Sequence, residues 1–144
     1  MPDLPDWTFA SGIIPRTIYT PVQDTYFLAY STSIPPSTKA TIRILEGFGP
    51  GMPWIPAGYL FAINYASVTA DQNSLITLEI GEENPQNVGN PKWIAARFGY
   101  GEAEFTLGLN YVFYPNTRPV YAVSNFLDEE IYVVIIVNGI LERL

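Results

Sequence analysis

The chain has 144 residues with no cysteine and no histidine, and its 7 Lys+Arg against 14 Asp+Glu give a formal charge of −7. The missing cysteines exclude disulfides, thiolate metal sites and Cys nucleophiles, and the missing histidines exclude an imidazole base and a Ser-His-Asp triad. A few scattered basic residues in an acidic chain cannot neutralise a row of phosphates, so binding to nucleic acid or to an anionic membrane is disfavoured.

Surface composition predicts self-association. Only 15% of the residues are charged, whereas aromatic residues also reach 15%; globular domains usually carry about 25% charged residues. Tyr, Trp and Phe are enriched in the cores of interfaces, where Lys and Glu are depleted. We therefore expect an oligomer or an assembly, and the alternative is a monomer with a neutral polar surface.

Residues 1–24 form a distinct segment with prolines at positions 2, 5, 15 and 21. Prolines fix φ and remove backbone donors, so we predict an extended arm rather than a helix or a central strand. The arm carries large apolar residues that a disordered leader would lack, and we expect it to dock either on its own domain or on a neighbouring subunit. These predicted partner-binding residues are Trp7, Phe9, Ile13, Ile14, Ile18 and Tyr19. The start of the chain lacks the charge and apolar run of a secretory signal, and we expect a soluble protein.

Residues 25–144 are predicted to form one all-β domain. Short runs rich in β-branched and aromatic residues alternate with Gly, Pro and Asn turn signals, and no convincing amphipathic helix occurs. About eight strands with uneven loops favour a jelly-roll or Greek-key β-sandwich. The predicted strands are 25–31, 40–46, 59–66, 74–80, 92–98, 104–111, 119–125 and 131–137. The last run, IYVVIIV, has no polar break, so we expect a central strand that is covered on both faces.

Acidic residues cluster in three places: at 82–83, at 102 and 104, and at 128–130. Paired carboxylates could serve a glycosidase or bind calcium. We instead expect each cluster to decorate a loop or the start of a strand and to keep the surface soluble, because the spacing matches no calcium loop. The glycine-rich turns at 47–51 and 99–101 lack the context of a phosphate-binding loop. The sequence thus predicts no enzyme activity, no metal and no cofactor.

The loop 49–56, GPGMPWIP, places Met52 and Trp54 between three prolines. Prolines lower the entropic cost of ordering a loop, so this loop could present its side chains rigidly to a partner. Trp54 could equally fold back and cap one end of the sandwich. We take both Met52 and Trp54 as candidate partner-binding residues.

Four stretches carry a family resemblance in their alternation of turns and strands. They are IPPSTKATIRI at 34–44, WIPAGYLFAIN at 54–64, PNTRPVYAVSNF at 115–126 and the run from 131 to 139. In this alternation the chain resembles small jelly-roll virion proteins of tailed bacteriophages, in particular the capsid decoration (cement) proteins of thermophilic long-tailed phages.

The resemblance implies a trimer seated on the outer capsid lattice. In that arrangement it clamps neighbouring major capsid proteins after the shell expands, and an N-terminal extension reaches a neighbour. We therefore expect a non-enzymatic structural protein at the capsid surface of a virion, with itself and the major capsid protein as partners. The alternative is a carbohydrate- or receptor-binding β-sandwich module of a virion, in a head fibre, tail or neck. A hydrolase working through paired carboxylates ranks last.

Overall fold

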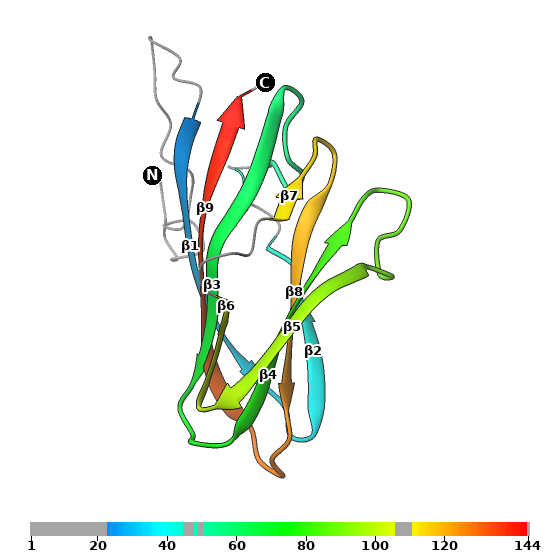
Figure 1. Cartoon of the computed structure of the whole chain (residues 1–144). Coiled ribbons are helices and arrows are strands. Elements are labelled where there is room, and N and C mark those ends of the chain that lie inside the picture. Colours follow the sequence, from blue (N-terminus) through cyan, green and yellow to red (C-terminus); the bar gives the residue numbers. More distant parts are fainter. Residues whose placement is uncertain (1–22, 45–47, 49–50, 106–110, 144) are drawn as a thin grey trace.

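The structure, a computed structural model, describes residues 23–44, 48, 51–105 and 111–143. It contains nine strands arranged in two antiparallel sheets that face each other, and the described residues form no helix (Figure 1). The predicted all-β sandwich is confirmed. The predicted arm, with its anchors Trp7, Phe9, Ile13, Ile14, Ile18 and Tyr19, lies outside the described residues.

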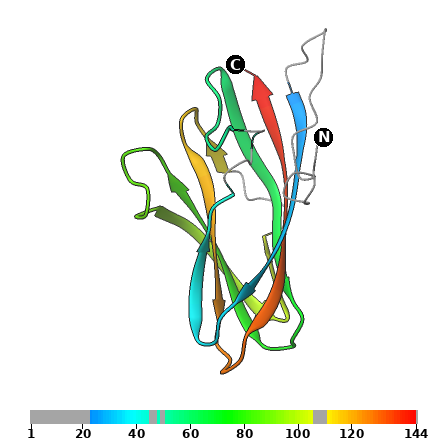
Figure 2. The same ribbon diagram turned by 180° about the vertical axis from the view of Figure 1, so that it is seen from behind.

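The first sheet has the strand order β1 (Gln23–Ile34), β9 (Ile131–Arg143), β3 (Tyr59–Ala70) and β6 (Glu102–Phe105), and β7 (Tyr111–Phe113) also pairs with β3. The second sheet has the order β2 (Thr38–Ile42), β8 (Arg118–Asn125), β4 (Leu75–Glu83) and β5 (Lys92–Tyr100). Seen from behind in Figure 2, β1 lies at the border of the first sheet and β9 lies next to it.

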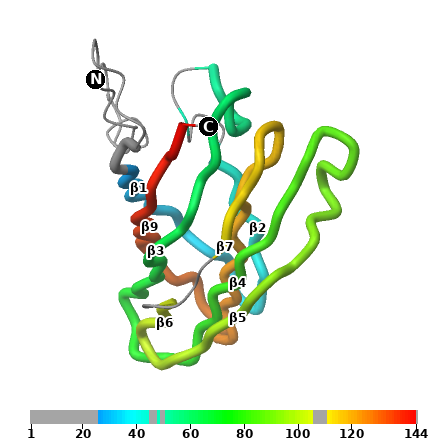
Figure 3. The backbone as a smooth tube through the Cα atoms, turned by 45° about the horizontal axis from the view of Figure 1, so that its top comes forward, coloured from blue at the N-terminus to red at the C-terminus, as the bar shows by residue number. Residues whose placement is uncertain are grey.

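Most connections cross from one sheet to the other, which is the connectivity of a jelly roll. β4 and β5 are consecutive strands of one sheet and form a hairpin that projects from the sandwich (Figure 3). The predicted strand at 104–111 overlaps two short strands, β6 and β7, and residues 106–110 between them lie outside the described part. The predicted strand 131–137 begins at the first residue of β9, but β9 continues to Arg143. The regular apolar run thus located the strand but not its end.

The core lies between the two sheets and follows strand alternation. In β9, the residues at positions 131, 133, 135 and 137 are all buried against the opposite sheet. An aromatic cluster fills one end of the core, where the Tyr26 and Phe61 rings lie 4.6 Å apart and the Phe48 and Phe61 rings 5.3 Å apart. Such tilted and edge-on pairs are favourable beyond the area that they bury.

β9 is central in the first sheet, as predicted, because it pairs with both β1 and β3. Its outer face is less covered than predicted. Tyr132 is 49% exposed, and the outer residues at 134, 136, 138 and 140 are half-buried. The described part of the chain thus leaves an apolar strand face open to contact. No helix of the described residues is long and apolar enough to cross a membrane.

Candidate functional site

Three loops lie toward the same end of the sandwich: 51–58 before β3, 84–91 between β4 and β5, and 114–117 between β7 and β8 (Figure 1). The first and third loops are joined through Ile55, whose backbone N–H donates to the Thr117 carbonyl at 2.9 Å and whose carbonyl accepts from the Asn116 N–H at 2.9 Å. Ile55 itself is buried. These backbone bonds fix the two loops relative to each other.

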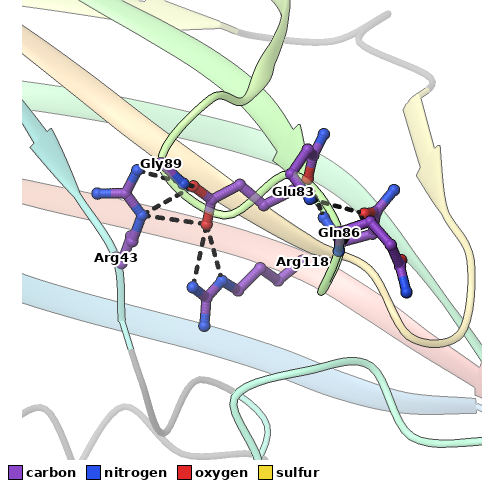
Figure 4. Close-up of polar contacts among 7 residues, drawn as sticks. Arg43, Glu83, Gln86, Gly89 and Arg118 are labelled. Atoms are coloured by element: carbon purple, nitrogen blue, oxygen red, sulfur yellow. Dashed lines mark hydrogen bonds and ion pairs between the residues drawn. The ribbon is translucent and has the colours of Figure 1, made fainter.

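A buried ion cluster ties the second loop to the same end (Figure 4). Glu83, the last residue of β4, has no exposed surface, and Arg118 beside it in β8 is 5% exposed. Arg43, which follows β2, contributes its Nη2 at 2.7 Å from Glu83 Oε2, and Arg118 Nη2 lies 3.0 Å from Glu83 Oε1. Three adjacent strands of the second sheet thus converge on one carboxylate.

The pKa of the Glu83 carboxyl is lowered in this cluster. Burial alone would raise it, because a charged carboxylate loses its hydration. The opposing hydrogen bonds from Arg43, from the Gly89 N–H and from Arg118 outweigh burial and favour the charged form. From the sequence we expected the acidic pair at 82–83 to decorate a loop or the start of a strand, and for Glu83, which is buried at the end of β4, this expectation is wrong. The carboxylate is buried because two guanidinium groups replace its water.

The 84–91 loop is shaped around the same carboxylate. Gly89 has a φ of +89°, a left-handed value that suits glycine, and its N–H donates to Glu83 Oε2 at 2.9 Å. At the other end of the loop, the Asn84 side chain accepts from the N–H groups of Gln86 at 2.8 Å and Asn87 at 3.1 Å. Hydrogen bonds at both ends therefore hold the 84–91 loop in one conformation.

Of the two loop residues singled out in the sequence, Trp54 is half-buried and Met52 is 40% exposed. The Trp54 ring lies against Arg118, with the guanidinium carbon 4.1 Å from the ring centroid. Trp54 thus folds onto the ion cluster, whereas Met52, two positions earlier in the loop, is exposed. Whether either residue binds a partner stays a prediction.

Exposed apolar side chains occur on all three braced loops. Met52 is 40% exposed on the 51–58 loop, Val88 is 54% exposed on the 84–91 loop, and Tyr114 is 59% exposed on the 114–117 loop. We call these three loops with Met52, Val88 and Tyr114 the loop end. Rigid loops that expose apolar side chains bind partners with less entropic cost than mobile ones.

A second group of exposed aromatic side chains lies on β5, at the border of the second sheet. Phe98 is 75% exposed and Tyr100 is 72% exposed. Nearer the hairpin tip, the Lys39 Nζ lies 5.0 Å from the centroid of the Trp93 ring and 2.8 Å from a Glu79 oxygen. The outer surface of this sheet therefore combines partly paired charges with two freely exposed rings.

The other acidic clusters form no metal site in the described part of the chain, where no group of three or more acidic side chains is close enough to hold an ion. Glu104 instead accepts a hydrogen bond from the Tyr65 hydroxyl at 3.1 Å, and Glu129 accepts one from the Gln72 amide at 2.9 Å. An open hollow of about 280 Å³ lies at the other end of the second sheet. It is lined by Ser37, Thr38, Lys39, Ser124, Asn125 and Phe126.

No signal in the sequence marked Arg43, Arg118, Val88 or Tyr114, and the acidic pair that contains Glu83 was expected at the surface. The partners in the ion cluster are separated by 35 and 40 positions in the chain, so no local pattern joins them. A signal for Glu83 and Arg118 would have required the pairing of β4 with β8, which places these two residues directly opposite each other.

No family model matches the chain, and no curated protein matches it either. Among solved structures, the chain is similar to the tripod (BppUct-A-L) from the baseplate of bacteriophage Tuc2009, with 13% identity, a TM-score of 0.37, and coverage of 83% of this chain and 47% of that chain. It is also similar to HppE with cobalt(II) and Tris buffer, with 16% identity, a TM-score of 0.28, and coverage of 88% and 50%. The iron(II) HppE complex with substrate gives 13% identity, a TM-score of 0.28, and coverage of 88% and 51%. The chain spans about half the length of these proteins.

Proposed function

We propose that this protein is a non-enzymatic virion structural protein that self-associates as a trimer and stabilises a viral capsid by binding the outer lattice of major capsid proteins. The observation that supports it best is the loop end. There Met52, Val88 and Tyr114 are exposed on loops that Arg118, Glu83 and a network of backbone bonds hold in place. The virion and the trimer are proposed because the sequence resembles capsid decoration proteins.

Stabilisation of a lattice by such a protein follows from mass action. A protein that binds the assembled shell and not its separated subunits stabilises the shell by its binding free energy, about 2.7 kcal/mol per site at a free concentration of 100 times Kd. Apolar anchors near the centre of an interface supply most of such binding energy. The loop end is suited to this role because its conformation is set before binding.

The test is co-sedimentation with expanded capsids of a thermophilic long-tailed phage from which the decoration protein is absent. Wild-type protein should sediment with the capsids, and the double variant Met52→Ser and Tyr114→Ser should bind at least tenfold more weakly, which corresponds to about 1.4 kcal/mol. The matched control is Phe126→Ser. Phe126 is 55% exposed and follows the opposite end of β8, so this variant should bind like the wild type. Lack of wild-type binding, or equal binding of the double variant, contradicts the proposal.

A second candidate function is a carbohydrate- or receptor-binding module of a virion, and the exposed rings of β5 favour it. Phe98 and Tyr100 stand on one side of the strand, two positions apart, and present flat apolar faces to solvent. A glycan array with wild-type protein and with Phe98→Ser tests this function. Glycan binding that is lost in Phe98→Ser supports it, and an array without hits removes it.

A further inference from the structure

We propose that a second copy of this chain binds at the β1 border of the first sheet. By the β1 border we mean the outer edge of β1 together with the adjoining outer faces of β1 and β9. The inference deepens the proposed function, because it assigns a surface to the self-association that this function includes. It rests on strand pairing and charge, independently of the loop end.

The β1 edge is long and regular. All twelve residues of β1 pair with β9 in consecutive register, from Gln23 opposite Glu142 to Ile34 opposite Ile131, with no bulge. On its other side β1 pairs with no described strand. Asp24 is its sole charged residue, and the strand contains no Lys, Arg or Pro. Such an edge offers a row of backbone donors and acceptors to any incoming strand.

The other sheet borders carry the features that normally prevent edge pairing. β2 is only five residues long and carries Lys39. β5 carries Lys92 and Arg97, and its pairing with β4 has a register shift. β6 is four residues long and carries Glu102 and Glu104, and β7, which pairs with β3 alone, is three residues long. Only the β1 border lacks these protections among the described borders, which indicates that it is covered in the working assembly.

The adjoining sheet face carries a single charge, Glu142, at one end. The outer positions of β1 are Phe27, Ala29, Ser31 and Ser33, and those of β9 are Tyr132, Val134, Ile136, Asn138, Ile140 and Glu142. Phe27 is 42% exposed and Tyr132 is 49% exposed. A sheet face that meets water normally alternates with polar side chains, so apolar residues on both faces of β9 are typical of a strand that is covered on both sides.

Charge argues that the occupant is a second copy of the chain. Two copies each carry a formal charge of −7, so they repel except where the touching surfaces are neutral. The β1 border is such a surface, because its charged residues, Asp24 and Glu142, lie at one end of the strand pair. A positively charged partner would instead be drawn to the acidic parts of the surface.

The test compares two identical substitutions on edge strands of the two sheets. Ala29→Lys places a charge at the outer face of β1, and Ala96→Lys places one on β5 opposite Glu79. Both should fold, because edge strands accept lysine. Light scattering over a dilution series should give an oligomer for the wild type and for Ala96→Lys, and the 16.1 kDa monomer for Ala29→Lys. A wild-type monomer at all concentrations, or an unchanged mass for Ala29→Lys, overturns the inference. An unchanged mass is also the result expected if residues 1–22 of the same chain cover the border.

Hydrogen exchange of the wild-type protein tests the same interface without any substitution, so a folding defect in a variant cannot affect the result. The β1 amides should exchange at least tenfold more slowly at a concentration where the oligomer forms than at one where it dissociates. A change of mass without slower exchange in β1 would place the interface elsewhere and overturn the inference. Capsid co-sedimentation is measured separately, so self-association through β1 without capsid binding would reject the proposed function and leave this inference standing.

Discussion

Arg118 donates two hydrogen bonds to a single oxygen of Glu83, from Nε at 3.1 Å and from Nη2 at 3.0 Å. Both side chains are almost completely buried, so neither can turn to water if the other is lost. This pair joins β8 to the end of β4, and through Gly89 it also sets the loop that follows. The stability of the loop end should therefore depend on it.

Glu83→Gln should destabilise the protein strongly. The amide keeps the size of the side chain but leaves Arg118 buried without its counter-charge, and breaking a buried pair in this way costs about 3–5 kcal/mol. Urea unfolding measures the change. The control is Glu79→Gln, which breaks the more exposed pair with Lys39 and should cost about 0–1 kcal/mol. Equal losses in the two variants would contradict a special role for Glu83.

Acid should destabilise the wild-type protein through the same carboxylate. The pKa of Glu83 is lower in the folded protein than its usual 4.5, because the hydrogen bonds of the two arginines and Gly89 outweigh burial. The unfolded chain then binds more protons as the pH falls, so this contribution is fully present above about pH 4.5 and is lost as the pH drops through the folded pKa. Urea midpoints from pH 7 to pH 3 should fall more steeply for the wild type than for Glu83→Gln. Parallel curves would show that another group controls the acid response.

The fold was largely predictable because the core follows simple periodicity. Positions such as Ile76, Leu78 and Ile80 alternate with polar neighbours and are all buried. The apolar run of β9 likewise marked a central strand. These signals are local, and each is repeated several times along the chain.

The loop end was predictable only in part. Prolines marked the loop of Met52 and Trp54, but the partner of the Trp54 ring, Arg118, lies 64 positions further along the chain. Glu83 looks like a surface acid in the sequence because its burial depends on two arginines from other strands. Residues that come together from distant strands have no characteristic spacing in the sequence.

Trp54→Leu should weaken the loop end more than Trp54→Phe. The guanidinium carbon of Arg118 lies 4.1 Å from the centroid of the Trp54 ring, and a desolvated contact of this kind contributes about 2 kcal/mol. Leucine removes the ring face, whereas phenylalanine keeps one. Urea unfolding should therefore show a loss of about 2 kcal/mol or more for leucine and a smaller loss for phenylalanine. Equal losses would mean that the ring contributes by its volume alone.

Tyr121→Phe should not destabilise the protein. The Tyr121 hydroxyl is buried and has no hydrogen-bond partner within the described part of the chain. Burial, together with the neighbouring Tyr26, raises its pKa well above 10, so the group stays neutral. Removing an unsatisfied buried hydroxyl spares a desolvation cost of about 1–3 kcal/mol, and we expect unchanged or higher stability. The control, Tyr132→Phe, removes an exposed hydroxyl that bonds Ser31 and should change stability by about 0.5 kcal/mol or less. A loss above about 1 kcal/mol in Tyr121→Phe would reveal a hydrogen bond.

Gly139→Ala should destabilise the first sheet where β9 passes β3. A Cβ at position 139 would lie 2.5 Å from the Ala62 carbonyl oxygen and 2.6 Å from the Phe61 ring, and the register of β3 with β9 shifts directly after Ile63. Backbone cannot move aside as a flexible side chain can, so we expect a loss of about 1–3 kcal/mol in urea unfolding. Asn138→Ala is the matched control, because its side chain is half-buried on the outer face and its removal should cost about 0.5 kcal/mol or less. A Gly139→Ala protein as stable as this control would show that the two strands can separate at no cost.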